Sequence, residues 1–157
     1  MTGFAAAISD WARETEGAFE AVFHASAQEV FNAVRLSVKD GGRMPIKTGN
    51  LRRSFLASTA AMPSIKEGAA TFPDMGGASE LTIAGAPLGS TVYIGAQAAY
   101  AARLNYGFVG EDSLGRTYNQ TGYGFIEAVS QRWPQIVAAE EAKVRARFEA
   151  GPVPQSV

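Results

Sequence analysis

The sequence contains no cysteine and a single histidine, His24. Disulfide frameworks and thiolate nucleophiles are therefore excluded, and a zinc site is not expected. The sequence also lacks an apolar run near the ~18 residues that a membrane span requires, and a charged segment typical of a signal peptide. Charged residues make up 18% of the chain and the net charge is −1. This balance argues against nucleic-acid binding through the whole domain.

Apolar residues are plentiful: 46% of the 157 residues are hydrophobic, enough for one domain with its own core. We predict a single domain over residues 1–150 and a flexible tail over residues 151–157. A low-charge surface rich in Gly, Ala and Tyr is typical of surface buried in an assembly. A compositional habit of the source genome explains it equally well.

Residues 8–38 have the apolar spacing of one long helix. The helix is expected to start at Ser9 or Asp10 as N-cap and to end at Gly41-Gly42. A helix of ~30 residues is ~45 Å long. That is more than a small domain needs for its own core, so we expect part of the apolar face to meet another subunit.

The middle of the chain has weaker signals. Pro45 favours an extended backbone, and Thr48 is expected to cap a short helix carrying Leu51, Arg52 and Ser54. Residues 55–60 alternate as a strand. The Gly- and Pro-containing stretch 62–79 is predicted as a loop, followed by strands at 80–84 and 90–95 that form a hairpin.

The last third returns to helix. Residues 98–106 are predicted as a short helix ended by Gly107, and residues 108–122 as a second long loop. Helix resumes at 123–132, where Pro134 either kinks it or starts a new segment that continues to about Glu149. The pattern predicts an α+β fold, in which a long N-terminal helix and a C-terminal helix pack on a small antiparallel sheet with two long loops.

Motifs for catalysis are missing from the sequence. His24 lies mid-helix without a nucleophile elbow, and Glu111-Asp112-Ser113 lacks the spacing of a Ca²⁺ loop. Lys47-Thr48-Gly49 has the wrong order for a phosphate-binding loop. We therefore expect no enzyme activity, no cofactor and no metal site.

Two features suggest interactions instead. Six of the fourteen Lys/Arg residues fall within nineteen positions, namely Arg35, Lys39, Arg43, Lys47, Arg52 and Arg53. They form either a solvated face or a contact with an acidic partner or with DNA phosphates, for which Arg43 and Lys47 are the candidate DNA-channel contacts. The second feature is the glycine-rich segment containing Tyr106, Phe108 and Tyr118, which is typical of an interaction loop.

Three segments, in this order, carry a family resemblance: Thr48-Gly49-Asn50-Leu51-Arg52-Arg53-Ser54, then residues 100–107 (Tyr-Ala-Ala-Arg-Leu-Asn-Tyr-Gly), then Gly124-Phe125-Ile126-Glu127-Ala128. The chain resembles the small neck or minor tail proteins of long-tailed bacteriophages, the family of lambda minor tail protein Z-like tail-completion proteins. The resemblance spans roughly residues 8–149. One departure is Asn105, where the family commonly has Glu; another is the stretch 62–79, which matches no family pattern.

The resemblance implies a non-enzymatic virion protein that is assembled in the bacterial cytoplasm. Copies would form a ring around the DNA channel at the head–tail junction and join the capsid connector to the tail tube. The implied partners are further copies of the chain, a head-completion or connector protein, a tail terminator or tail tube protein, and genomic DNA held non-specifically; no membrane is implied.

The residues expected at the assembly interface are Thr48, Leu51, Arg52, Arg53, Tyr100, Tyr106, Phe108 and Tyr118. Within the family, a tail terminator that caps the tube is the alternative. An alternative of another class is a DNA-binding or assembly-chaperone module that is absent from the mature particle.

Overall fold

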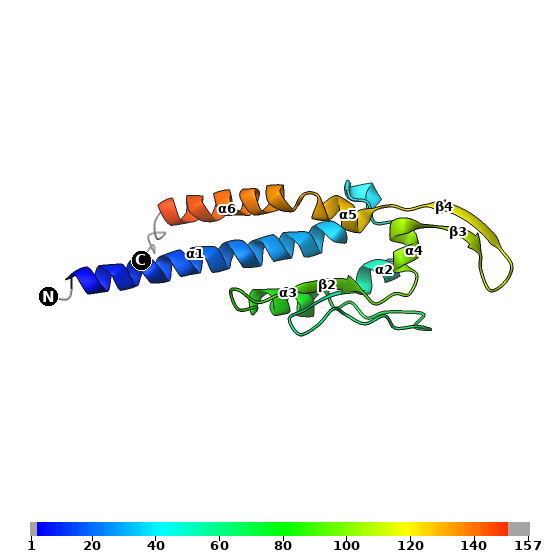
Figure 1. Cartoon of the computed structure of the whole chain (residues 1–157), viewed down its shortest axis with the longest axis horizontal. Helices are drawn as coiled ribbons and strands as arrows, with labels where there is room; N and C mark the ends of the chain where they lie inside the picture. The colour runs from blue at the N-terminus through cyan, green and yellow to red at the C-terminus, as the bar shows by residue number, and fades with distance from the viewer. Residues whose placement is uncertain (1–2, 151–157) are drawn as a thin grey trace, which may run out of the picture.

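The computed structural model describes residues 3–150 and is elongated (Figure 1). Helix α1 (Gly3–Val34) runs along the molecule, and α6 (Trp133–Glu149) packs antiparallel against it. A two-stranded sheet and α3 (Gly76–Ala84) lie on the other side of α1. The predicted α+β class and the long helices at the two ends of the fold are confirmed.

The boundaries of α1 differ from the prediction at both ends. The helix starts at Gly3, before the predicted caps Ser9 and Asp10, and ends at Val34. The chain then folds into a 3-10 turn, η1 (Val38–Asp40), whose N-cap Ser37 accepts a hydrogen bond from the backbone N–H of Asp40. These local bonds compete with continuation of the helix.

The central sheet pairs β1 (Phe55–Ser58) with β2 (Tyr93–Ala96) in antiparallel register. The predicted strand at 80–84, and hence its hairpin with 90–95, is wrong, because residues 76–84 form α3. In a helix, Ser79 and Ile83 share one face, and both are buried. The Ser79 hydroxyl accepts the backbone N–H of Ala57, which fixes α3 along the edge of β1.

The predicted loop at 108–122 is instead a second hairpin, formed by β3 (Gly107–Glu111) and β4 (Thr117–Thr121). The side chain of Asp112 accepts the backbone N–H groups of Leu114 and Arg116, each at 2.9 Å, and so organises the turn. The helix before it, α4 (Ala101–Tyr106), ends at Gly107 as predicted, with φ at 88°.

The C-terminal helices are α5 (Phe125–Ser130) and α6, and Pro134 lies in the first turn of α6. The second of the two predicted roles for this proline is therefore confirmed. The predicted tail 151–157 lies outside the described residues.

The hydrophobic core lies where the C-terminal third of α1, the central sheet, α3 and α5 meet. Its largest fully buried side chains are those of Phe31, Met44, Phe55, Ile83 and Phe125. The rings of Phe55 and Phe125 are 6.1 Å apart in an edge-to-face arrangement. Within α1, only Ser26, Ala27, Phe31 and Val34 are buried. The core therefore uses only the last part of a 32-residue helix.

Candidate interaction surfaces

The three segments that carry the family resemblance meet in space, and buried asparagines join them. Asn50, in α2 (Asn50–Arg53), donates from Nδ2 to the hydroxyl of Tyr100 at 3.2 Å and to the carbonyl of Ala70 at 3.1 Å. Its Oδ1 accepts the backbone N–H of Phe72 at 2.8 Å. Asn50 thus holds the first segment to the second and fixes the loop that leads to α3.

Asn105 joins the second segment to the third. Its Nδ2 donates to both carboxylate oxygens of Glu127, at 2.9 and 2.8 Å, and its Oδ1 accepts the backbone N–H of Ile126 at 3.0 Å. The last bond satisfies a free donor at the start of α5, where the preceding residue, Gly124, has no side chain to do so. We call the region joined by Asn50, Asn105 and the Phe55–Phe125 pair the junction.

The predicted interface residues in the first segment have different environments. Leu51 is 5% exposed and belongs to the core, so in the folded chain it is not available to a partner. Thr48 is exposed, and its hydroxyl accepts the backbone N–H of Asn50 at 3.3 Å. The N-cap position of α2 is nevertheless Gly49, at φ 77°, and not Thr48 as predicted.

The basic cluster divides into internal and exposed cations. Arg35 is buried above the ring of Phe31, 4.4 Å from its centre, and its Nε donates to the carbonyl of Arg52 at 3.3 Å. Desolvation, followed by repulsion from Arg52, lowers the pKa of Arg35. Arg53 is half-buried and donates to the carbonyls of Phe72 and Thr48. Both arginines therefore stabilise the fold.

The remaining four cations of the cluster have exposed side chains: Lys39, Arg43, Lys47 and Arg52. They include Arg43 and Lys47, the two residues predicted to face a DNA channel. An exposed basic surface of this kind attracts an acidic partner or phosphates without selecting a base sequence. The structure thus leaves the predicted DNA contacts open to solvent, whereas Arg35 is buried and Arg53 is half-buried and bonded to backbone carbonyls.

The β3–β4 hairpin projects from the body beside α4 (Figure 1). On one of its faces the rings of Phe108 and Tyr118 lie 6.0 Å apart, and the guanidinium of Arg103 covers Phe108 at 4.2 Å. Three apolar side chains at the base, on β3 and in the turn remain at least 70% exposed, those of Tyr106, Val109 and Leu114. Of the predicted interface residues in this part of the chain, Tyr106 is 70% exposed, Tyr100 and Tyr118 are at the surface, and Phe108 is half-buried.

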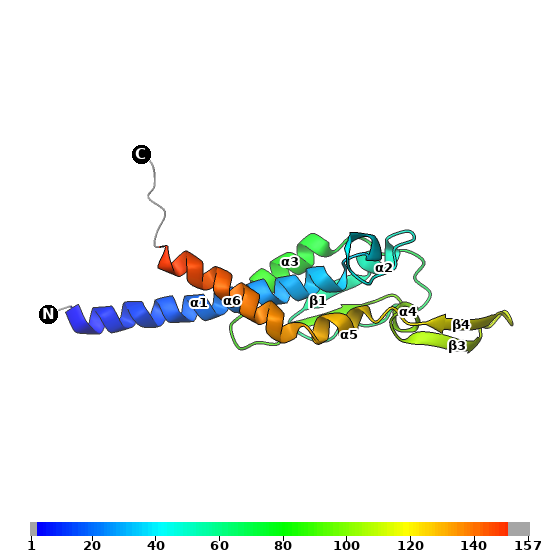
Figure 2. The same cartoon turned by 90° about the horizontal axis from the view of Figure 1, so that it is seen from above.

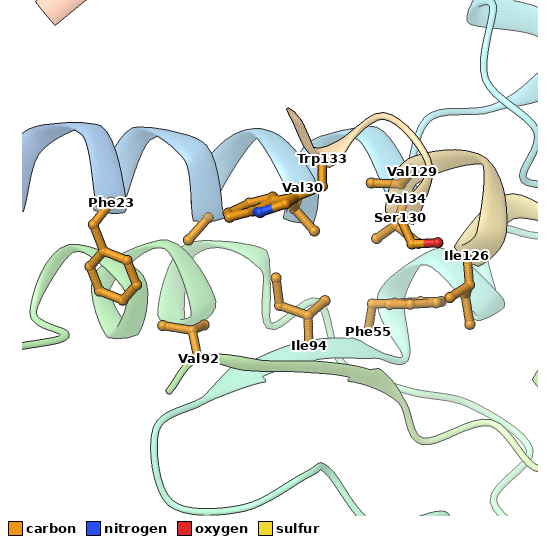
Figure 3. Close-up of a pocket in the computed structure, with 11 residues that line it drawn as sticks. Phe23, Val30, Val34, Phe55, Val92, Ile94, Ile126, Val129, Ser130 and Trp133 are labelled. Carbon is orange, nitrogen blue, oxygen red and sulfur yellow. The ribbon is translucent and has the colours of Figure 1, made fainter. Parts of the chain in front are cut away.

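An apolar depression opens between α1, the central sheet and α5; we call it the side groove. Its volume is 440 Å³. Val92 and Ile94 point into it from the sheet, Phe23 and Val30 from α1, and Trp133 lies at the start of α6 (Figure 3). The remaining lining residues are Ala27, Val34, Phe55, Ile126, Val129 and Ser130. The sequence did not predict this groove, because its residues come from four separate stretches of the chain.

A second groove of 510 Å³ follows the α1–α6 contact and includes Trp11, Phe19 and Phe148. It continues into the N-terminal part of α1, which extends past the end of α6 (Figure 2). Large apolar side chains are exposed along this part of α1, namely Phe4 (81%), Ile8 (49%), Trp11 (66%) and Phe19 (64%). The predicted excess of helix beyond the core is confirmed, whereas contact with another subunit stays a prediction.

A comparison with known proteins found no matching family model, no similar curated protein and no similar solved structure. Within residues 3–150, no group of three or more His, Asp or Glu side chains is placed to hold a metal ion. No helix in the described part of the chain combines the length and apolarity needed to cross a membrane. His24 packs against the body, where its Nε2 lies 2.6 Å from the carbonyl oxygen of Ala86.

Proposed function

We propose that this chain is a structural virion protein of a long-tailed bacteriophage, which assembles into a ring around the DNA channel at the head–tail junction and joins the capsid connector to the tail tube. It acts without catalysis and without a cofactor. Its partners are neighbouring copies in the ring, the connector or head-completion protein on one side, and the tail terminator or tail tube protein on the other.

The observation that carries this proposal is the placement of uncovered apolar side chains at both ends of an elongated molecule. Phe4 and Trp11 are exposed at one end, and Val109 and Leu114 at the other. Exposed apolar surface that is not used in a protein's own core commonly marks contact with other proteins. Two different surfaces at opposite ends suit head-to-tail contacts, which close into a ring when the rotation between copies permits.

The three family-like segments support the assignment in another way. They come together through Asn50, Asn105 and the Phe55–Phe125 pair, so they act as parts of one structural unit. A resemblance in segments that build the same junction is more informative about fold than three unrelated short matches. The ring and its position in a particle remain part of the proposal.

Oligomeric state is the first test. Mass photometry and sedimentation velocity on the purified chain, over a wide concentration range, should show a closed oligomer of fixed size. A chain that remains monomeric at every concentration would contradict the proposal. Reconstruction of particles carrying a labelled copy should then place the ring at the neck; density at the end of the tail tube would favour the terminator alternative.

One observation favours the second candidate, a DNA-binding or chaperone module absent from the finished particle: the exposed side chains of Lys39, Arg43, Lys47 and Arg52. Titration with duplex DNA at several salt concentrations separates the candidates. A free module should bind DNA as a monomer with a strong salt dependence. The ring protein should instead show little DNA binding before assembly.

For the ring protein, the double substitution Lys47→Glu with Arg52→Glu should leave the monomer folded but impair particle completion.

A further inference from the structure

We propose that one assembly contact is a strand addition: β3 of one copy pairs with the outer edge of β2 in the next copy, and Val109 enters the side groove. This inference rests on the proposed function, since it names the surface through which neighbouring copies in the ring would meet. Four features of the molecule support it: the free edge of β2, the position of the side groove, the geometry of β3, and the direction of the hairpin.

The outer edge of β2 presents unpaired backbone groups. The backbone N–H of Ala57 donates to the Ser79 hydroxyl at 3.1 Å, which points it away from β2. Ile94 lies directly opposite Ala57. When two residues lie opposite each other in an antiparallel pair, both direct their N–H and C=O groups toward the partner strand, or both direct them away from it. The N–H and C=O of Ile94 therefore point outward, as do those of Ala96 two residues later.

Within residues 3–150, no strand is paired along this outer edge of Tyr93–Ala96. The loop after β1 passes close to β2: a side chain at Gly95 would lie 2.8 Å from the sulfur of Met62. Just beyond the strand, the N–H of Lys66 donates to the carbonyl of Gln97 at 2.9 Å. Natural sheet edges are commonly protected by charged residues or proline. The strand Tyr-Ile-Gly-Ala contains neither. In the described part of the chain, this edge of β2 therefore has no paired strand and carries neither of these protecting residue types.

A strand added at this edge would extend the face of the sheet on which the side groove lies. Val92 and Ile94 both line it, and they are two residues apart on the same face (Figure 3). A residue placed opposite Ile94 in an added strand would project its side chain to that same face. An added strand therefore needs an apolar side chain at the position opposite Ile94, where the groove is lined by carbon.

β3 meets this requirement. The backbone N–H of Asp112 donates to the carbonyl of Arg116 across the hairpin. The direction of the N–H and C=O groups alternates from one residue to the next along a strand. Val109 is three residues before Asp112, so its N–H and C=O point away from β4, toward the free edge of β3. Its side chain is 76% exposed. On β4, the residues with outward backbone groups are Thr117, Asn119 and Thr121, which are polar and would fit the groove poorly.

The partner strand must come from a second copy. The hairpin projects beyond α4, away from the body (Figure 2). Its base is fixed by close backbone contacts: a side chain at Gly122 would lie 2.3 Å from the carbonyl oxygen of Asn105, and one at Gly107 would lie 2.5 Å from that of Gln120. The hairpin lies beyond α4, away from its own β2 (Figure 1), so the partner in the proposed contact is the β2 of a neighbouring copy.

Photo-crosslinking tests this contact directly. A benzoylphenylalanine at position 109, in an equal mixture of ordinary and ¹⁵N-labelled chains, should yield crosslinks between chains of different isotope content. Mass spectrometry should locate them on peptides containing Phe23, Val92 or Ile94. The same probe at position 113, in the hairpin turn, serves as control and should not label the groove.

A substitution at position 109 tests the same contact through its effect on the concentration needed for assembly. Val109→Lys should raise the concentration for half-assembly about tenfold or more, because an ammonium group would have to enter an apolar groove. Ser113→Lys adds the same charge in the turn and should leave assembly unchanged. Both sites are exposed, so both variants should retain the thermal stability of the monomer.

The outcomes separate the two proposals. A ring that forms normally with Val109→Lys, or that gives crosslinks only outside the groove, overturns the strand addition and leaves the proposed function standing. A chain that stays monomeric under all conditions overturns both.

Discussion

The junction and the two ends of the molecule use aromatic residues in opposite ways. At the junction, Phe55 and Phe125 are each 1% exposed, whereas Phe4 and Tyr106 at the ends are 81% and 70% exposed. Polar side chains follow the same division, since Asn105 is buried with its hydrogen bonds satisfied and Asn119 on the hairpin faces solvent. The comparison indicates that the junction supports the stability of the monomer and that the aromatic side chains at the ends contribute little to it.

The largest expected effect on stability is at the centre of the junction. Phe125→Ala should lower the free energy of unfolding by about 3–5 kcal/mol, because it removes a buried ring and leaves a cavity beside Phe55. Tyr106→Ala, an aromatic truncation at an exposed site, should change it by about 0.5 kcal/mol or less. Urea denaturation of both variants measures the difference; equal losses would show that the division between junction and ends is wrong.

A smaller loss is expected at Asn105. Asn105→Ala leaves the N–H of Ile126 and the carboxylate of Glu127 without their partner, and should cost about 1–3 kcal/mol. Asn119→Ala, at the surface of β4, is the matched control and should fall within about 0.5 kcal/mol of the parent. An unchanged free energy of unfolding in Asn105→Ala would mean that water replaces the asparagine. The link between the second and third segments would then contribute nothing to stability.

The hairpin should respond locally to pH through Asp112. Hydrogen bonds from the backbone and side chain of Arg116, together with those from Leu114 and Tyr118, lower the pKa of Asp112 below its ordinary value of 3.8. A lowered pKa in the folded state stabilises the hairpin above the ordinary pKa, and this stabilisation is lost as the pH falls through the lowered value. The ring resonances of Phe108 and Tyr118 should report this loosening in strong acid while the core signals persist.

Asp112→Asn provides the control for this titration. The variant should have a looser hairpin at neutral pH, because the neutral amide is a weaker acceptor for Arg116. Its hairpin resonances should not show the acid transition of the parent. An unchanged transition in the variant would assign the effect to another group.

The smallest expected effect on monomer stability is at the start of α1. Phe4→Gln with Trp11→Gln replaces two exposed apolar side chains by a good helix former, so the free energy of unfolding should stay within about 0.5 kcal/mol. Self-association measured by sedimentation velocity should nevertheless weaken. Unchanged association would mean that this end of α1 contributes nothing to assembly.

Local signals predicted the helices well where they were unambiguous. Apolar spacing identified α1, Gly107 marked the end of α4, and Pro134 marked the start of α6. Residues 80–84 were ambiguous, because Glu-Leu-Thr-Ile-Ala alternates like a strand; its helical form depends on burial of Ser79 and Ile83 against β1. Tertiary packing therefore determines that residues 80–84 are helical and not a strand, and the local sequence pattern could not predict this outcome.

The hairpin and the junction were missed for a related reason. Glycines at 107, 110 and 115 interrupt the alternation that normally indicates strands, and the turn depends on the side chain of Asp112. The roles of Asn50 and Asn105 depend on partners 20 or more positions away, Ala70 and Tyr100 for the first and Glu127 for the second. Charge clustering likewise could not show that Arg35 and Arg53 bond to backbone carbonyls.

At the root of the hairpin, the backbone N–H groups of Tyr123 and Gly124 donate to the carbonyls of Leu104 and Asn105, and these bonds hold the hairpin at one angle to α4. If the hairpin carries the contact to the next copy, that angle also fixes the rotation from one copy to the next. Successive equal rotations return to the starting point after a definite number of copies. The backbone bonds at the root of the hairpin would then set the diameter of such a ring.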